Sequence, residues 1–456
     1  MAHAPAAAAD NDAPAVTQAL ARFVATHPSR GWNDAVEAEA HRTLLNWLGC
    51  AIGAAHHDAV SMALAACQVL QPAPQAAVLG RRERVDIGSA AFINGIASHT
   101  FDFDDTHLRT IIHPAGPVAS ALLSLGEHLK SPGRALIDAL VLGIEVSCRL
   151  GNMVYPDHYD RGWHITGSTG VFGAAAGCAR LLGLDEIGTQ MALGIAASQP
   201  VGLREQFGSM TKPLHPGAAA RVGLMAALLA REGYTSSLRS IEARRGWAQV
   251  VSTRFDWREA TDGLGERFEI SANSYKPYAC GIVIHPSIEA CVGLRAQGVA
   301  PSDVQRIELR VHPLVLELTG KSEPEDGLQA KFSVFHGCAA GLIFGRAGEA
   351  EFADAVVTQP AVIELRRRVH ATAVDDIAED AVNLTAWLVD GRQLQVRIDH
   401  AVGSSARPMS DEALDAKFMS LVAPVIGERC SKSLLRQCRG AADLSHVEEL
   451  VALASN

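Results

Sequence analysis

The spacing of apolar residues changes character partway along the chain, and this change constrains the fold more than any other feature. From about Val16 to about Arg245, apolar residues recur at the spacing of buried helix faces, and Gly and Pro stand at the joints. Alanine is abundant and favours helix because it loses no side-chain entropy there. This part of the sequence therefore predicts an all-helical domain. We expect helices over residues 34–55, 86–97, 117–129, 135–150, 167–182, 186–197 and 217–231.

A different pattern follows in the second half. Val304–His312 alternates apolar and polar residues, as a half-buried strand does. Further on, Leu384–Val389 and Leu394–Ile398 flank Asp390-Gly391, a dipeptide that favours a hairpin with a type I′ turn. The pattern predicts an α+β unit with an antiparallel sheet. Helices are expected between these strands over residues 286–296 and 331–342.

The helical pattern returns after about residue 404, with helices expected over residues 411–421 and 445–454. We expect this C-terminal segment to pack back on the first half of the chain. The predicted fold is mainly α: a large all-helical domain over residues 1–265, completed by residues 405–456, and a smaller α+β domain over residues 266–404.

The overall charge disfavours several classes of partner. The chain of 456 residues carries a formal net charge of −10 and has no long block of Lys and Arg. Nucleic acids and anionic membrane surfaces are therefore not expected partners. An acidic chain also repels anionic substrates at long range, so a polycarboxylate site would need a local concentration of positive charge.

The nine cysteines are scattered and form no C-x-x-C motif. This pattern indicates buried thiols in a reducing compartment, and it lacks the clustered thiolates of an iron–sulfur dehydratase. The first 14 residues show neither the basic start nor the apolar run of a signal peptide. Later apolar stretches are too short, or too interrupted by charge, to cross a bilayer. We therefore expect a cytoplasmic protein.

The first candidate motif is the acidic run Asp102-Phe103-Asp104-Asp105-Thr106-His107, followed by His113-Pro114. Three carboxylates this close cannot all be buried and ionised without partners. The run fits a solvated helix end, a Mg²⁺ site like that of aspartate-rich prenyl synthases, or a carboxylate that orients a histidine for proton transfer. No matching acidic triad follows downstream, which disfavours the Mg²⁺ interpretation.

Two further motifs surround His164 and Lys212. His164 precedes a run of small residues where a helix is expected to begin, and the N-terminus of a helix attracts anions. Lys212 and His215 stand just before the helix predicted over residues 217–231, where a lysine and free amides could bind a carboxylate. Taken singly, each motif fits a capped helix start at least as well as it fits an anion-binding site.

Two more motifs lie in the second half. Lys276, Tyr278, Cys280 and Gly281 precede an expected helix and could line a cleft between the two domains. A buried thiol is the simpler interpretation of Cys280, because the sequence shows no base close to it. For His336, the simpler interpretation is a histidine satisfied within the core.

Taken together and in this order, the motifs resemble the MmgE/PrpD family, and the likeness runs from about residue 15 to about residue 450. The segments that carry it are Asp102-Phe103-Asp104-Asp105-Thr106 with His113-Pro114, Gly162-Trp163-His164, Met210-Thr211-Lys212-Pro213-Leu214-His215, and Lys276-Pro277-Tyr278-Ala279-Cys280. The family includes 2-methylcitrate dehydratases, cis-aconitate decarboxylases and iminodisuccinate epimerases. The resemblance implies a large helical domain completed by the C-terminus, a smaller α+β domain, and a homodimer.

The resemblance also implies roles for individual residues. Catalytic roles are expected for Asp102, Thr106, His113, His164 and Lys212. Substrate contacts are expected from His215, Lys276, Tyr278, Gly281 and His336. In the decarboxylase branch a histidine follows the K-x-[FY] motif, where this sequence has Gly281. That branch and the dehydratase branch tend to carry a tyrosine at the position of His336, and one extra residue separates Thr106 from His113. These departures disfavour a simple transfer of cis-aconitate decarboxylase activity.

We expect a lyase similar to the 2-methylcitrate dehydratases, acting on a small di- or tricarboxylate without a metal or other cofactor. Lys212, assisted by His215 and Lys276, would neutralise the substrate carboxylates. One of His113 and His164 would take a proton next to a carboxylate, and the other would deliver one. Stabilising the developing enediolate must supply several kcal/mol, which cations and amides in a water-poor cleft can do.

Asp102 is expected to orient or charge one of these histidines. Three alternatives remain: an epimerase of an amino- or imino-dicarboxylate, a cis-aconitate decarboxylase, and a family member that binds ligands without catalysis.

Overall fold

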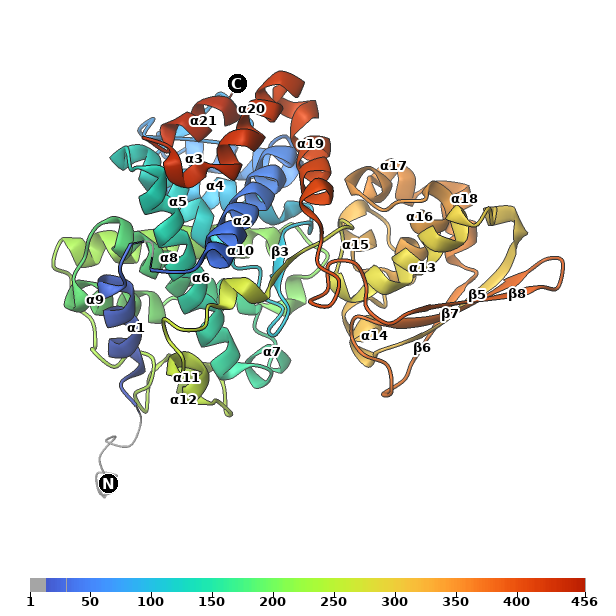
Figure 1. Ribbon diagram of the computed structural model, residues 1–456, viewed down its shortest axis with the longest axis horizontal. Helices are drawn as coiled ribbons and strands as arrows, with labels where there is room; N and C mark the ends of the chain where they lie inside the picture. The colour runs from blue at the N-terminus through green and yellow to red at the C-terminus, as the bar shows by residue number, and fades with distance from the viewer. Residues whose placement is uncertain (1–13, 30, 456) are drawn as a thin grey trace, which may run out of the picture.

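The fold has a large helical part and a smaller α+β part beside it, as the computed structural model in Figure 1 shows. The structure describes residues 14–29 and 31–455. The helices of the first part are α1 (Val16–Thr26), α2 (Asp34–Gly53), α3 (Asp58–Gln68), α4 (Ile87–Thr100), α5 (Ala115–Leu129), α6 (Gly133–Val154), α7 (Asp157–Asp160), α8 (Ile165–Leu181), α9 (Glu186–Ala197), α10 (Thr211–Arg231), α11 (Trp247–Val251) and α12 (Trp257–Thr261). Two antiparallel ribbons accompany them, β1 (Ala76–Ala77) with β2 (Arg84–Val85), and β3 (Asp105–His107) with β4 (Asn273–Tyr275).

The α+β part is built on a four-stranded sheet in the order β6-β5-β7-β8. Its elements are α13 (His285–Ala296), β5 (Val304–Val311), α14 (Pro313–Thr319), α15 (Gly327–Ala330), α16 (Val334–Phe344), α17 (Asp354–Val357), α18 (Pro360–Arg366), β6 (Val369–Ala373), β7 (Val382–Leu388) and β8 (Gln393–Ile398). The predicted fold class is confirmed, with one addition. β5, β7 and β8 pair antiparallel, but β6 runs parallel to β5 at the edge, so the sheet is mixed. Every second residue of β7 is buried, as expected for a sheet covered by helices on one face.

The β7–β8 hairpin forms where it was predicted, but its turn differs from the expected type I′. Of the two central residues, only Gly391 has a positive φ, at 88°. The backbone N–H of Leu388 donates to the carbonyl of Arg392, and that of Gly391 donates to the carbonyl of Leu388. The loop therefore has three residues and ends with a left-handed glycine, a common alternative to the two-residue turn.

The C-terminal helices lie on the helical part. They are α19 (Asp411–Ile426), α20 (Glu428–Arg439) and α21 (Glu448–Ala454). Figure 1 shows them beside the N-terminal helices, and α19 packs directly against α2. Phe418 of α19 packs against Gly49 of α2, where an added Cβ would lie 3.1 Å from the phenyl ring. The exact domain boundaries given above stay predictions.

Local sequence signals explain most helix starts, and α10 is an informative exception. The side chain of Asn33 accepts a hydrogen bond from the backbone of Val36 and so caps α2. The helix predicted from Gly217 instead begins at Thr211, before two prolines. The first turn of a helix has no internal partners for its N–H groups, so Pro213 is tolerated there, and only Pro216 removes a helical hydrogen bond.

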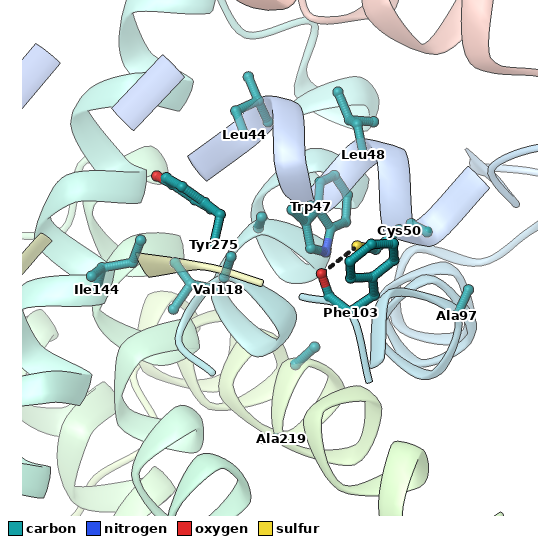
Figure 2. Close-up of a cluster of buried hydrophobic side chains, with 14 of the residues drawn as sticks. Leu44, Trp47, Leu48, Cys50, Ala97, Phe103, Val118, Ile144, Ala219 and Tyr275 are labelled. Atoms are coloured by element: carbon teal, nitrogen blue, oxygen red, sulfur yellow. Dashed lines mark hydrogen bonds between the residues drawn. The ribbon is translucent and has the colours of Figure 1, made fainter. Parts of the chain in front are cut away.

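The core of the helical part reaches directly under the acidic motif. In Figure 2, Phe103 points into a cluster with Trp47, Leu48 and Ala97, and it is 5% exposed. Its carbonyl accepts a weak hydrogen bond from the Cys50 thiol at 3.4 Å. Burying a phenylalanine contributes about 1.5–3 kcal/mol. This residue therefore anchors the backbone on which the flanking carboxylates stand.

Close helix packing completes the frame. α10 crosses α4 where Gly95 faces Gly217, and an added Cβ at Gly95 would lie 2.5 Å from the Gly217 Cα. None of the helices in the described residues combines the length and the unbroken apolar run that a bilayer crossing needs. All nine cysteines are free, and all except the half-buried Cys430 are buried, as the scattered pattern predicted.

Candidate active site

Two motifs that are distant in sequence meet at the β3–β4 ribbon. Asp105 of β3 pairs with Tyr275 of β4 in an antiparallel register. Asp102 precedes β3 and Lys276 follows β4, so the ribbon brings the two segments side by side, and the Lys276 side chain reaches the Asp102 carboxylate. The ribbon thereby joins the first half of the chain to the start of the α+β part.

Asp102 carries a buried carboxylate on a strained backbone. It follows the end of α4 with a φ of 49°, in the left-handed region that costs L-residues about 1–2 kcal/mol. Its Oδ1 accepts hydrogen bonds from Nζ of Lys212 at 2.8 Å and from Nζ of Lys276 at 2.9 Å. Burial alone would raise the pKa of Asp102, but the two ammonium groups hold it well below the usual range. The carboxylate is therefore ionised and fixes both lysines.

The two lysines give the site its positive charge. Lys212 lies in the first turn of α10, with Nζ 5.4 Å from the ring centre of Phe207 and 5.2 Å from that of Phe332. Burial lowers the pKa of Lys212 against the opposing effect of Asp102. The pKa of Lys276 is raised, because nearby carboxylates outweigh the effect of burial. Two cations share one carboxylate here, so the trio of Asp102, Lys212 and Lys276 keeps a net positive charge for an anionic ligand.

His113, in the loop between β3 and α5, has a defined tautomer. Its Nδ1 lies 2.6 Å from the backbone oxygen of Asp105 and 3.3 Å from Oγ1 of Thr106. A carbonyl can only accept, so Nδ1 carries the proton of the neutral ring and Nε2 keeps a free lone pair. Burial lowers the pKa of His113 to about 3. The ring is thus neutral near pH 7 and can accept a proton.

His164 and His215 form a second pair of rings. His164 precedes α8, and its Nδ1 lies 2.8 Å from Nδ1 of His215, so one ring donates to the other. Burial lowers the pKa of His164 well below its usual range, and nearby cationic groups add to this effect. When His164 is protonated on both nitrogens, Nδ1 must donate to His215 and Nε2 holds the second proton.

A fourth histidine at the site, His99, was not anticipated from the sequence. It lies in the last turn of α4, and its Nδ1 is 2.7 Å from Oδ2 of Asp104. Its ring centre is 4.8 Å from that of His113 and 5.7 Å from that of His164. The carboxylate that orients a histidine is therefore Asp104, whereas the hydrogen bonds of Asp102 go to lysines. A histidine five residues before Asp104, at a helix end, was the available signal.

These groups surround a pocket between the two parts of the molecule. Its polar lining is Asp102, His113, His164, Lys212 and Lys276. Its other side is closed by Gly281, Ile282, Val283, Leu318, Thr319 and Phe332, together with Phe207, Ile111 and Tyr159. The structure thus brings four of the five expected catalytic residues to one pocket, and the fifth, Thr106, contacts His113 from behind.

Two of the residues expected to contact the substrate lie outside the pocket lining. The ring of Tyr278 packs edge-on against His285, with ring centres 5.4 Å apart. His336 is buried in α16, where its Nε2 lies 3.0 Å from the backbone oxygen of Glu351. Neither residue lines the pocket, because the loop after β4 packs Tyr278 against His285 and α16 buries His336 within the α+β part. Gly281 does line the pocket, and His215 reaches it through His164.

Lys417, which the sequence did not single out, supports the site from the C-terminal segment. Its buried Nζ donates to the backbone oxygens of Phe103 and Lys276 and to Oδ1 of Asn46. Burial lowers the pKa of Lys417 to about 8. The side chain therefore ties α19 to the segments that carry Asp102 and Lys276, a contact that only the tertiary fold creates.

The geometry of a metal site can be tested on the same residues. Among the described residues, His99, His113 and His164 bring ring nitrogens within 4.8 Å of one another, as do ligand atoms of His99, Asp102 and Asp104. Two ammonium groups already occupy the Asp102 carboxylate and would repel a cation placed beside it. A metal-free site stays a prediction.

Comparison with known proteins assigns the family. Residues 18–260 match the MmgE/PrpD N-terminal domain, and residues 278–439 match the MmgE/PrpD C-terminal domain. The chain belongs to the MmgE/PrpD family, as its motifs predicted.

Several relatives are similar over nearly their whole length. A cis-aconitate decarboxylase from Aspergillus terreus is 26% identical over 442 residues, covering 90% of each chain. A cis-aconitate decarboxylase-like protein from Aspergillus oryzae is 27% identical over 445 residues, covering 91% of this chain and 92% of the relative. The cis-aconitate decarboxylase from Homo sapiens is 28% identical over 390 residues, covering 80% and 78%. The family and these relatives support an enzyme.

Proposed function

We propose that this protein is a metal-free lyase that acts on a small tricarboxylate by moving a proton next to a carboxylate. The observation that carries the proposal is the Asp102–Lys212–Lys276 trio, which faces the same pocket as His113 and His164. A net positive charge in a buried pocket favours an anionic substrate. The same charge stabilises the enediolate that forms when the proton leaves.

The tautomers of His113 and His164 support different roles for the two rings, one as base and the other as acid. His113 has a free Nε2 lone pair, because its Nδ1 proton is held by the Asp105 carbonyl, and it acts as the base. The protonated His164 ring keeps its Nδ1 proton in the hydrogen bond to His215 while its Nε2 delivers a proton, and it acts as the acid. A bound polycarboxylate raises the pKa of both rings toward neutrality by its negative charge.

The leading candidate reaction is dehydration of a hydroxy-tricarboxylate such as 2-methylcitrate. His113 takes the proton next to the carboxylate, and His164 protonates the leaving hydroxyl. Gly281 favours this candidate over decarboxylation. It lines the pocket at the position where the resemblance places a histidine in the decarboxylase branch. Even a Cβ there would lie 3.0 Å from Thr319 Cγ2, so no larger side chain fits without movement.

Decarboxylation of cis-aconitate is the second candidate. The names of the relatives, at 26–28% identity over most of their length, favour it. The same lysines could bind the carboxylates of cis-aconitate, and His164 could protonate the carbanion left when carbon dioxide departs.

One screen separates the candidates. Purified protein, with a chelator present, is offered 2-methylcitrate, citrate, cis-aconitate and iminodisuccinate in D₂O, and the products are followed by proton NMR. A new alkene from a hydroxy acid supports dehydration, and an alkene with loss of carbon dioxide supports decarboxylation. Deuterium exchange without an alkene would favour an epimerase. Activity that the chelator abolishes would contradict the metal-free proposal, and no reaction with any of the four would contradict the lyase itself.

The homodimer and the cytoplasmic location also belong to the proposal. The family resemblance supports the dimer, which light scattering on the purified chain would test. The free, buried thiols support a reducing compartment, which localisation of a tagged chain would test.

A further inference from the structure

His99 and Asp104 form a buried pair that the proposed acid and base do not account for. Both side chains are essentially unexposed, at 0% and 1%, and neither lines the pocket. Asp104 accepts the Nδ1 proton of His99 at 2.7 Å, which leaves a lone pair on His99 Nε2. That Nε2 is buried with no hydrogen-bond partner. An unpaired buried nitrogen is destabilising, so this arrangement beside the pocket requires an explanation.

The position of the His99 ring suggests a role for this unpaired nitrogen. His99 stacks on His164 with an interplanar angle of 27°, and its ring also lies close to that of His113. The rings of His113 and His164 are farther from each other, with centres 6.4 Å apart. One ring nitrogen from each of the three residues lies within 4.8 Å of the others, a gap that a single water molecule can bridge.

The proposed reaction leaves the two pocket histidines in the wrong protonation states. After one turnover His113 holds the proton taken from the substrate, and His164 has given its proton away. The next turnover needs that proton moved from His113 to His164. The apolar side chains Phe207, Leu318 and Phe332 line the pocket beside these rings, and none of them can carry the proton.

We propose that His99, held by Asp104, is a positioning residue that carries this proton from His113 to His164 and so resets the site between turnovers. This inference rests on the proposed function. The Nε2 proton of His113 passes to the free Nε2 of His99, which becomes an imidazolium paired with the Asp104 carboxylate. His99 then releases the same proton to Nε2 of His164. No bond other than N–H forms or breaks, and no net charge enters or leaves.

The charges around His99 determine how strongly its ring holds the transferred proton. Asp104 bonds Nδ1, and Asp102 lies farther off on the same segment; both favour the imidazolium. Lys212 of α10 and the rings of His113 and His164 oppose it when they are charged. Burial also opposes it and lowers the pKa of His99 overall. The proton therefore stays on His99 only briefly, as a relay requires.

Rapid-quench kinetics of His99→Gln test the relay. Glutamine can keep a hydrogen bond to Asp104 but cannot carry the proton. The first turnover should match that of the wild type, because the pocket starts in the ready state. The steady-state rate should fall on the order of 10- to 100-fold, with KM little changed. His158→Gln is the matched control, since His158 is equally buried, bonds Ser168 and stacks on Trp163 outside the pocket. Its first and later turnovers should change together, if at all.

A first turnover that slows as much as the steady state in His99→Gln would overturn the relay, as would an unchanged steady state. Inactive wild-type protein would instead contradict the proposed function. A substrate-free measurement keeps the relay testable in that case. In spectra of ¹⁵N-histidine-labelled wild type, the ring signals of His113 and His164 should titrate together, and in His99→Gln they should titrate independently. Equal coupling in both proteins would overturn the relay.

Discussion

The helical part and the α+β part contribute unlike side chains to the same pocket. The helical part supplies Asp102, His113, His164 and Lys212, all ionisable and all fixed by hydrogen bonds. Beyond Lys276, which directly follows the ribbon that joins the two parts, the α+β part supplies Gly281 and an apolar wall. The comparison indicates that the chemistry belongs to the helical part and the shape of the pocket to the α+β part.

The largest expected effect lies on the helical side. In Lys212→Met the pocket loses a cation, while Asp102 keeps Lys276 as its partner. We expect kcat/KM on the active tricarboxylate to fall about 10²- to 10³-fold, as when one oxyanion donor is removed. KM should rise and kcat should fall together. Lys432→Met, at a surface ion pair with Glu428, is the control and should be unaffected. Unchanged kinetics in Lys212→Met would remove this residue from the site.

The buried histidines of the helical part predict acid sensitivity. Burial lowers the pKa of His113 to about 3 from an ordinary value of 6.5, so the unfolded chain binds more protons than the folded protein between these values. The free energy of unfolding should therefore rise with pH across this window. From pH 6.5 to pH 4.5 the loss is on the order of 2 kcal/mol for one such ring.

Urea unfolding at several pH values measures this slope. In His113→Gln the slope should be shallower, because one of the titrating rings is gone. A wild-type stability that stays flat between pH 4.5 and 6.5 would show that these histidines are protonated in the folded protein.

On the α+β side we expect changes of selectivity more than of rate. In Gly281→Ala, the new Cβ meets Thr319 Cγ2 at 3.0 Å and narrows the pocket wall. We expect kcat/KM to fall several-fold, and by different factors for substrates of different size, since a methyl group in an apolar pocket is worth about 1–3 kcal/mol. Relative rates on 2-methylcitrate and citrate measure this. Equal factors for both would contradict a shaping role.

The smallest effect is expected where the two parts meet at the surface. Arg204 bonds Glu317 across the boundary at 2.7 Å, but the Glu317 side chain is 54% exposed. Glu317→Gln should therefore cost about 0.2–1 kcal/mol at most, measured by thermal unfolding, with activity unchanged. A large loss of activity would mean that this ion pair holds the two parts in the arrangement that catalysis needs. The chemistry of the helical part would then depend on the position of the α+β part.

Prediction from the sequence succeeded where the signal was local. The Asn33 cap, the alternation in β5 and β7 and the hairpin position depend on neighbouring residues, so a short window contains them. The α10 start was misplaced because Pro213 suggests a break, although a first turn tolerates proline. β6 was missed because an edge strand depends on pairing with a partner that is distant in sequence.

The candidate site shows the same difference between local signals and long-range contacts. The ordered motifs were enough to assign the family and to single out Asp102, His113, His164 and Lys212, because each motif is contained in a short stretch of sequence. The sequence could not show that Asp102 bonds lysines while Asp104 bonds His99, because that choice depends on which side of the buried Phe103 each carboxylate lies. Tyr278 and His336 belong to motifs of the right type, but the fold packs Tyr278 against His285 and buries His336 in α16.

Short-range chemistry thus determined the residue types, the helical character and the family of this protein. Tertiary structure alone decided which charges became partners, that Lys417 reaches the site from the far end of the chain, and that three histidines share one cluster. The physical reason is that burial makes an unpaired charge costly, so the final pairing is set by which groups the whole fold removes from water together.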